Sequence, residues 1–185
     1  MTQPTLETKR LILRPFTLGD AKDVQHLAGD PAVASTTAAI PHPYPDGAAE
    51  VWIRGQAEAW RQKKNAIFAM VVKGNGPLIG AIDLIINERQ SKAELGYWVG
   101  VPYWNKGYCT EAAATIIRFG FDSLNLHKIS ARYIASNPAS GEVMKKIGMK
   151  QEGYLREELV RNGRREDMVV YGILKAEFQE DVLKP

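Results

Sequence analysis

The stretch PYWNKGYCTEAAATIIRFGF, residues 102–121, changes from an aromatic, glycine-containing loop into a run with helical spacing. It directly follows AELGYWVGV, residues 93–101, which predicts a strand. The helix is predicted to begin with Thr110 as its cap and Glu111 in its first turn. Because the first N–H groups of a helix are unpaired and carry partial positive charge, such a turn binds anions. We therefore expect the main-chain donors of residues 106–110 to hold a diphosphate.

The Lys106-Gly107 pair at this turn is compatible with an anion site but is weak evidence alone. Gly107 lets the backbone curl without a Cβ in the way, and Lys106 would add a full positive charge. Any strand-to-helix turn can contain the same residue types. The chain has neither G-x-x-x-x-G-K-[ST] nor a properly placed G-x-G-x-x-G, which disfavours ATP or NAD as the ligand.

The rest of the chain alternates between predicted strands and helices. Strands are expected at residues 6–16, 66–73, 77–86, 92–101, 127–135, 154–161 and 164–174. Helices are expected at residues 19–30, 49–63, 110–124 and 137–148. The turns GNGP and Asn162-Gly163 predict hairpins. This order, βααβββαβαββ, predicts a single α/β domain over residues 1–185, of the α+β kind, with one mixed sheet and helices on both faces.

The composition limits the classes of function. The 185 residues include 24 basic and 21 acidic side chains, and a net charge of +3 does not favour a nucleic-acid-binding surface. A single cysteine, Cys109, excludes an intramolecular disulfide, and the scattered histidines give no metal site. The sequence shows no signal peptide and no apolar run of membrane-spanning length. We expect a soluble, cytoplasmic protein with no membrane partner.

Four stretches taken in order carry a family resemblance: AELGYWV, YWNKGYCTEAA, ASNPASGEVMKKIGMKQEG and NGRREDMVVYGIL. Together they resemble the GNAT acetyltransferases, and among them the RimJ/RimL type, which acetylates the N-terminal amines of ribosomal proteins. The resemblance runs from residue 6 to about residue 174. Residues 30–65 match least, and in this family that region helps to shape the acceptor site. The resemblance implies the GNAT fold, acetyl-CoA as cofactor and an amine as acceptor.

The phosphate loop of this family has the form Q/R-x-x-G-x-G/A, and residues 104–109 match it with two departures, Trp104 and Cys109. Cys109 is interpreted as a small buried hydrophobe, with a catalytic role less favoured. The resemblance implies that the diphosphate lies on the amides of Lys106, Gly107, Tyr108, Cys109 and Thr110. It implies strand-like pairing of the pantetheine arm with Trp98, Val99 and Gly100, and contacts from Asn137 and Ser140.

Transfer of an acetyl group to an amine requires a base, an oxyanion donor and a hydrogen bond for the departing thiolate. Glu94 lies four residues before Trp98, on the strand face where several GNAT enzymes carry the base, and Asp83 is the second candidate. For both carboxylates a purely structural role remains open. The backbone N–H of Val99 is the candidate oxyanion donor.

Ser140, in NPAS, matches a serine that the family resemblance assigns to the leaving sulfur. A hydroxyl holds its proton too tightly to surrender it to a thiolate, so a hydrogen bond is expected rather than proton transfer. Capping of the following helix is the alternative for Ser140. Lys145 and Lys146 are interpreted as a solvated helix face.

The sequence thus predicts an enzyme that acetylates the N-terminal α-amine of a protein or peptide. A small amine acceptor, such as a polyamine, an amino acid or an antibiotic, is the first alternative. A module that binds acyl-CoA without turnover is the second. The sequence leaves the oligomeric state open, a homodimer included, and predicts no direct nucleic-acid partner.

Overall fold

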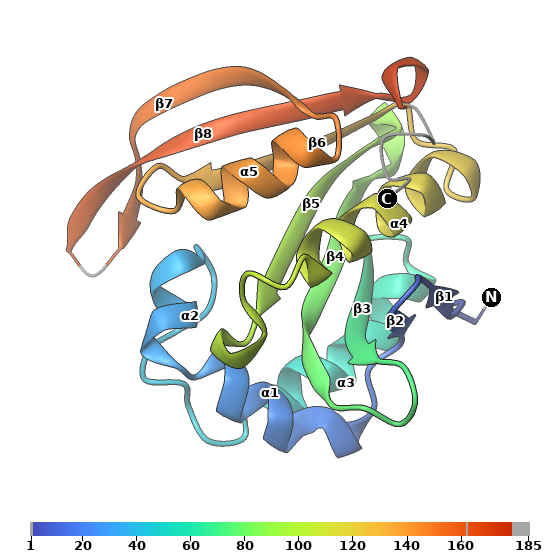
Figure 1. The fold of residues 1–185 in the computed structure, drawn as a ribbon, viewed down its shortest axis with the longest axis vertical. Coiled ribbons are helices and arrows are strands. Elements are labelled where there is room, and N and C mark those ends of the chain that lie inside the picture. Colours follow the sequence, from blue (N-terminus) through green and yellow to red (C-terminus); the bar gives the residue numbers. More distant parts are fainter. Residues whose placement is uncertain (1, 162, 179–185) are drawn as a thin grey trace.

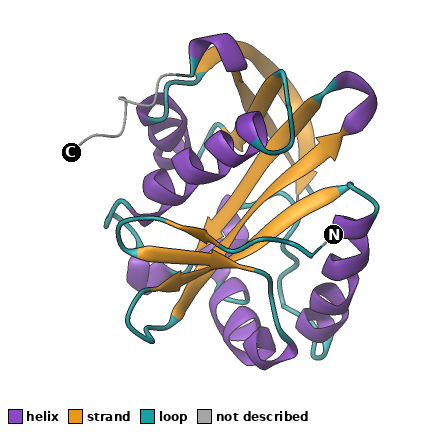
Figure 2. Ribbon diagram, turned by 90° about the vertical axis from the view of Figure 1, so that its right-hand side faces the viewer, coloured by secondary structure: helices purple, strands orange, loops and turns teal. Residues whose placement is uncertain are grey.

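The computed structural model describes residues 2–161 and 163–178. In them an eight-stranded mixed sheet carries helices on both faces (Figures 1 and 2). The strands are β1 (Leu6–Glu7), β2 (Leu11–Arg14), β3 (Asn65–Val72), β4 (Leu78–Asn87), β5 (Lys92–Val99), β6 (Lys128–Ile134), β7 (Lys150–Arg161) and β8 (Arg164–Leu174). The longer helices are α1 (Ala21–Ala28), α2 (Pro31–Thr36), α3 (Ala48–Arg61), α4 (Tyr108–Asp122) and α5 (Pro138–Lys146). The mixed sheet with helices on both faces is thereby confirmed.

The sheet opens at its centre. Its strand order is β1-β2-β3-β4-β5-β6-β8-β7, and all neighbours are antiparallel except β5 and β6. These two strands pair only from Lys92 to Leu95, opposite Lys128 to Ala131. Farther along, β6 continues to pair with β8, while β5 from Gly96 to Val99 has no partner strand on that side among the described residues. The two strands therefore diverge and leave a free strand edge facing inward.

The two faces of the sheet bury different helices. Helix α4 packs on one face through alanine and isoleucine side chains, with Ile116 and Ile117 fully buried. Helices α1 and α3 cover the other face, where Val24 and Ile53 belong to a second apolar cluster. Strand alternation places Ile82 and Leu84 toward α4 and Asp83 toward the opposite side. The buried core therefore fixes β4 in a register that turns one carboxylate away from it.

The N-terminal strand is shorter than predicted. Instead of one strand over residues 6–16, β1 and β2 form a small hairpin. The Thr8 hydroxyl accepts hydrogen bonds from the backbone N–H groups of Arg10 and Leu11, which turns the chain there. The expected continuous strand is wrong at these residues.

Three further element boundaries differ from expectation. A short helix, α2, follows the first predicted helix, because the Asp30 side chain caps it and Pro31 occupies its first turn. Helix α4 begins at Tyr108 with Gly107 as its cap, so the prediction of Thr110 as cap is wrong. Strand β7 begins at Lys150, earlier than predicted. In the predicted Asn162-Gly163 turn, Asn162 lies outside the described residues, and Gly163 has φ +73°.

Among the described residues, no helix combines the length and the apolar character needed to cross a membrane.

Candidate active site

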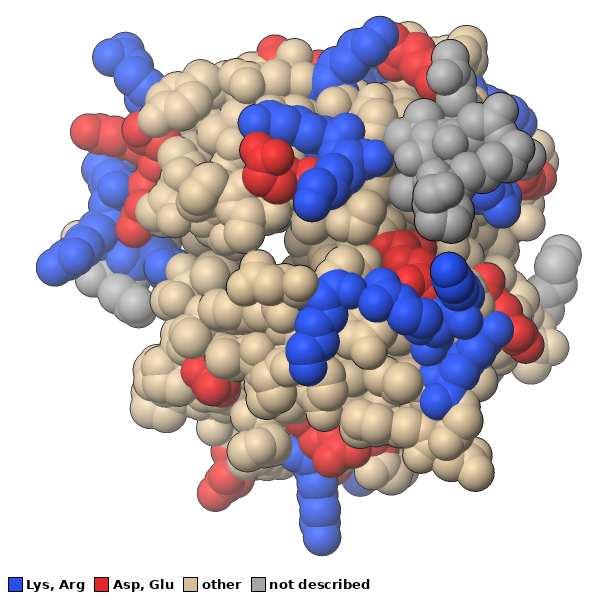
Figure 3. Space-filling model, viewed as in Figure 1, with Lys and Arg blue, Asp and Glu red and all other residues tan. Residues whose placement is uncertain are grey.

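A cavity of about 1150 Å³ lies where the sheet opens. Figure 3 shows a hollow in this face of the molecule, bordered mainly by uncharged side chains. The cavity wall includes parts of β4, β5, the start of α4, the start of α5, β7 and the segment after α2. Of the predicted site residues it includes Glu94, Trp98, Val99, Gly107, Tyr108, Cys109, Thr110, Asn137 and Ser140. Lys106 and Gly100 are not part of the wall.

The free edge of β5 offers backbone groups to the cavity at alternate residues. The Gly100 N–H donates to Ile79 O at 2.9 Å, so Gly100 and Trp98 direct their backbone groups toward β4. Tyr97 and Val99 therefore direct theirs toward the open edge. The Trp104 indole confirms this direction, because its Nε1 donates to Val99 O at 2.6 Å. Of residues 98–100, which are predicted to pair with the pantetheine arm, Val99 directs its N–H toward the gap, whereas Trp98 and Gly100 direct theirs toward β4.

The start of α4 forms a second set of open donors. Gly107 has φ +75°, a conformation that favours glycine, and it caps the helix. The Glu111 N–H bonds to Gly107 O at 3.1 Å, as the first i to i−4 bond of the helix. The N–H groups of Tyr108, Cys109 and Thr110 precede this bond, at positions that lack intrahelical acceptors. All three residues line the cavity, so the predicted anion site and the free strand edge share one space.

The side chain of Lys106 lies beside an aromatic ring, and the thiol of Cys109 lies at the cavity wall. Lys106 Nζ lies 5.7 Å from the centre of the Tyr103 ring, and its carbonyl is bound by Arg10. Burial raises the pKa of the Cys109 thiol well above its usual range, which keeps it protonated. Cys109 therefore acts as a small hydrophobe against the cavity.

Asp83 is one of the carboxylates that line the cavity wall. It is partly exposed to the cavity but shielded from bulk water, and this burial raises its pKa to about 6. A hydrogen bond from Asn65 lowers the pKa, and the negative charge of Glu94 raises it. In the described part of the chain Asp83 makes no ion pair. A carboxylate with this pKa is ionised at neutral pH and is more basic than an exposed aspartate.

Glu94 shares this face of the sheet but is engaged in an ion pair. Both of its oxygens accept hydrogen bonds from Arg132, from Nε and Nη2, each at 2.8 Å. The hydrogen bond that Arg132 donates to Glu94 is the largest cause of the raised pKa of Arg132. Because both of its oxygens are bound to a guanidinium, Glu94 is less available than Asp83 to contact a further donor. The geometry therefore favours Asp83 over Glu94 as the base.

Ser140 lies in the first turn of α5 and contacts Tyr97 rather than capping the helix. The Tyr97 hydroxyl is 2.7 Å from Ser140 Oγ and donates to Ser140 O at 3.1 Å. Burial raises the pKa of Tyr97 far above its usual range, so the phenol keeps its proton and acts as donor. Either hydroxyl can be the donor between Tyr97 and Ser140 Oγ, and when Tyr97 donates, the hydroxyl proton of Ser140 is free for another acceptor. No motif or spacing indicates that Tyr97 contacts Ser140, because the two residues are separated by 43 positions.

Two side chains donate hydrogen bonds to the end of α2, next to the cavity. Asn137 Nδ2 donates to Thr36 O at 3.3 Å, and Arg161 Nη1 donates to Ala34 O at 3.0 Å and Thr37 O at 3.2 Å. The segment that follows, residues 36–41, lines the cavity. Part of residues 30–65, the region that the resemblance expects to shape the acceptor site, thus lines the cavity. Asn137 lines the cavity, but its side-chain amide donates its hydrogen bond to α2.

Comparison with known proteins identifies the family. The model of the acetyltransferase (GNAT) domain matches residues 10–150. The chain belongs to the GNAT acetyltransferase family. This acetyltransferase is 30% identical over 182 residues to the uncharacterized N-acetyltransferase p20 of Bacillus licheniformis, covering 94% of this chain and 98% of that protein. As in other GNAT acetyltransferases, the acetyl donor is acetyl-CoA.

The names of two further relatives indicate different acceptors. The putative ribosomal N-acetyltransferase YdaF of Bacillus subtilis is 34% identical over 106 residues, covering 57% of this chain and 58% of YdaF. The structure of spermidine N-acetyltransferase from Vibrio cholerae with CoA and spermine aligns with a TM-score of 0.79 and 25% identity. That alignment covers 90% of this acetyltransferase and 96% of the Vibrio chain. The acceptor must therefore be inferred from the cavity itself.

Proposed function

We propose that this acetyltransferase acetylates the N-terminal α-amine of a protein or peptide, with Asp83 as the general base. The observation that carries the proposal is Asp83, a carboxylate of the cavity wall that has a raised pKa and makes no ion pair among the described residues. An α-amine has a pKa near 8 and a lysine side chain a pKa near 10.4, so an α-ammonium is roughly two hundred times more acidic. A base with a pKa of about 6 is therefore matched to an α-amine rather than to a lysine.

The charges of the acceptor side argue against a polyamine. A long polycation needs several carboxylates spaced along its binding site. The carboxylates of residues 30–65, namely Asp30, Asp46, Glu50 and Glu58, are all absent from the cavity wall. Of the other carboxylates in the wall, Glu94 pairs with Arg132, Glu142 pairs with Lys145, and Glu158 acts on Arg132. Asp83 remains as the carboxylate able to receive one ammonium group.

The cofactor fits the open donors of the site. Acetyl-CoA supplies an acetyl thioester, a diphosphate and an arm with amide groups. The N–H groups of Tyr108, Cys109 and Thr110 are placed to hold the diphosphate at the positive end of α4, with Gly107 giving close approach. The Val99 N–H faces the gap between β5 and β6, where an arm can pair with the free strand edge.

The reaction can be assigned to named groups of this chain. Asp83 accepts a proton from the ammonium, directly or through one water, and the neutral amine nitrogen forms a bond with the acetyl carbon. The Val99 N–H donates a hydrogen bond to the oxygen as negative charge develops there. As the carbon–sulfur bond breaks, the nitrogen loses its second proton, which passes to the departing thiolate directly or through water. The sulfur meanwhile receives a hydrogen bond from Ser140 Oγ, which contacts the Tyr97 hydroxyl.

The test is to offer acetyl-CoA to the purified chain with three kinds of acceptor and to locate the acetyl group by mass. The acceptors are peptides with free N-termini, including those of ribosomal proteins, the same peptides with blocked N-termini and an internal lysine, and free amines including spermidine. We expect labelling of the free N-termini alone. Labelling of spermidine but not of peptides would overturn the proposal. Binding of CoA without thiol release for any acceptor would instead show a binding module.

A further inference from the structure

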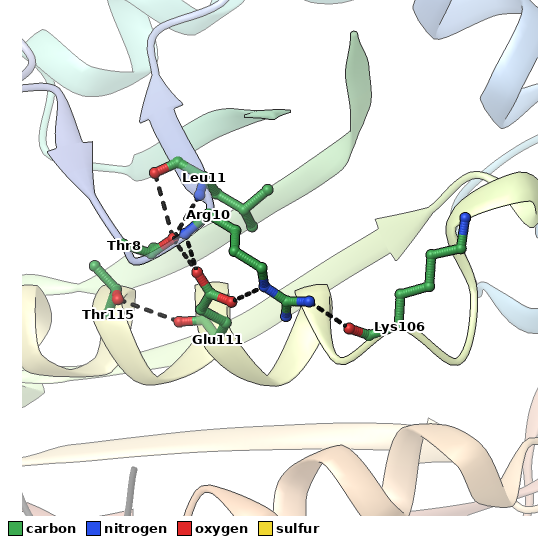
Figure 4. Close-up of polar contacts among 6 residues, drawn as sticks. All are labelled: Thr8, Arg10, Leu11, Lys106, Glu111 and Thr115. Carbon is green, nitrogen blue, oxygen red and sulfur yellow. Dashed lines mark hydrogen bonds and ion pairs between the residues drawn. The ribbon is translucent and has the colours of Figure 1, made fainter. Parts of the chain in front are cut away.

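The turn between β1 and β2 contacts the start of α4, although the two segments are 101 positions apart. Arg10 donates from Nε to Glu111 Oε2 at 2.7 Å and from its backbone N–H to Glu111 Oε1 at 2.7 Å. The Thr8 hydroxyl also donates to this carboxylate. Figure 4 shows the Arg10 side chain lying along the first turn of α4, between Glu111 and the carbonyl of Lys106.

Arg10 also holds the loop on both sides of Gly107. Its Nη1 donates to Lys106 O at 2.9 Å, immediately before the glycine. Its guanidinium carbon lies 4.4 Å from the centre of the Tyr108 ring, immediately after it, at cation–π distance. One side chain thus fixes the carbonyl and the ring that flank the left-handed residue. The direction of the N–H groups that follow depends on this loop geometry.

The charge of Glu111 makes Arg10 important for an anion. Glu111 lies one turn inside a helix whose start should attract a diphosphate, and an unbalanced carboxylate there would repel it. Burial alone would raise the pKa of Glu111, but hydrogen bonds from Thr8 and Arg10 outweigh this and lower it. Glu111 is therefore ionised, and its side chain is only 18% exposed, so water screens it weakly. Arg10 supplies the balancing charge.

We propose that Arg10 is a positioning residue of the cofactor site. It balances the charge of Glu111 and sets the loop so that the free N–H groups of α4 face the diphosphate of acetyl-CoA. The inference rests on the proposed placement of the diphosphate at residues 107–110. A role in the fold alone would make the same contacts, so the test must separate the two.

Two acetyl donors that carry the same thioester distinguish a role of Arg10 in diphosphate binding from a role in the fold alone. S-acetylpantetheine lacks the diphosphate, whereas acetyl-CoA carries it. We expect Arg10→Ala to raise the Kd for CoA, measured by calorimetry, and the KM for acetyl-CoA by about tenfold, with kcat little changed. The rate with S-acetylpantetheine should stay within about twofold of the unmodified chain. Arg10→Lys keeps the positive charge but not the forked hydrogen bonds. Its Kd for CoA should therefore lie between those of the unmodified chain and Arg10→Ala.

Two further variants test the charge argument. The double variant Arg10→Ala/Glu111→Gln removes both charges and should regain about threefold of the lost affinity for CoA. Lys73→Ala is the matched control, because Lys73 is a neighbouring cation whose side chain pairs with Glu7 on β1 at 2.9 Å. It should leave the Kd for CoA unchanged.

The outcomes distinguish this inference from the proposed function. Unchanged CoA affinity in Arg10→Ala, or an equal loss with both acetyl donors, overturns the positioning role of Arg10 alone. If the unmodified chain transfers acetyl groups yet binds CoA no better than S-acetylpantetheine, the placement of the diphosphate is wrong. If the unmodified chain transfers acetyl to no amine, the proposed function fails whatever Arg10 does.

Discussion

The carboxylate of Asp83 occupies the space above Gly96 on the neighbouring strand. A Cβ built on Gly96 would lie 2.5 Å from Asp83 Oδ1, closer than real Cβ atoms come to other heavy atoms. The two residues are direct partners in the β4–β5 ladder and both line the cavity. The missing side chain at position 96 therefore gives the candidate base its position.

Gly96→Ala should displace Asp83 and slow acetyl transfer. The added methyl group forces the carboxylate to move, and a shift of about 1 Å can cost roughly a hundredfold in rate. We expect kcat to fall by about that factor while CoA affinity stays unchanged. Gly55→Ala in α3 is the control, because a Cβ there meets no atom within 4 Å. Full activity of Gly96→Ala would show that Asp83 need not be where the structure places it.

The pH profile of kcat separates Asp83 from Glu94 as base. With Asp83 as base, kcat should fall as the pH drops through about 6, because the carboxylate becomes protonated. Asp83→Asn should lower kcat by about 10²–10⁴-fold and remove this decrease of kcat at low pH. Glu94→Gln should keep most of the activity and shift this decrease to lower pH, since the charge of Glu94 raises the pKa of Asp83. The reverse pattern, with Glu94→Gln inactive and Asp83→Asn active, would assign the base to Glu94.

The raised pKa of Asp83 also predicts how the stability of the chain depends on pH. Its pKa rises from 3.8 to about 6 on folding, so the folded state binds more protons than the unfolded state between these values. The free energy of unfolding therefore falls as the pH rises through this window. At about pH 8, Asp83→Asn should be more stable than the unmodified chain by up to about 3 kcal/mol, with no such gain below about pH 4.

Denaturant unfolding at both pH values measures this difference, and Asp23→Asn, at an exposed position on α1, is the control. A stability difference that does not change with pH would mean that burial does not raise the pKa of Asp83.

Periodicity predicted the long elements because their apolar faces repeat over several turns or strand residues. Helix α4, with eight buried residues, is the clearest case. The six residues of α2 are too few for such a signal, and only Asp30-Pro31 could have indicated that helix. The side-chain hydrogen bonds of the site join residues that are remote in sequence. They are Arg132 with Glu94, Tyr97 with Ser140, and Arg10 with Glu111. No spacing rule connects these residues, because the sheet order brings them together.

Ser140 and Tyr97 should act as one unit on the leaving group. Ser140→Ala removes the hydrogen bond to the sulfur and should lower kcat by about ten- to a hundredfold with little change in CoA affinity. Tyr97→Phe frees Ser140 Oγ to rotate and should lower kcat less. Because both changes affect the same hydrogen bond, the double variant should be no slower than Ser140→Ala. Independent, multiplicative losses would show that Tyr97 does not act through Ser140.

Arg161 joins two walls of the acceptor side, and its removal should weaken acceptor binding alone. The side chain reaches from β7 to the last carbonyls of α2, where its positive charge meets the negative end of the helix. Leu159 on the same strand and residues 36–41 after α2 both line the cavity. We expect Arg161→Ala to raise the KM for the acceptor about tenfold, as the loss of one charged hydrogen-bond cluster predicts.

The KM for acetyl-CoA should not change in the same variant, because the hydrogen bonds of Arg161 among the described residues go to the end of α2. Arg164→Ala is the matched control, since it removes an exposed arginine that pairs with Arg161 across the same hairpin. Arg161→Lys should restore part of the acceptor affinity, because one ammonium group can still reach the carbonyls. Equal increases in both KM values would show that Arg161 supports the whole fold rather than the acceptor wall.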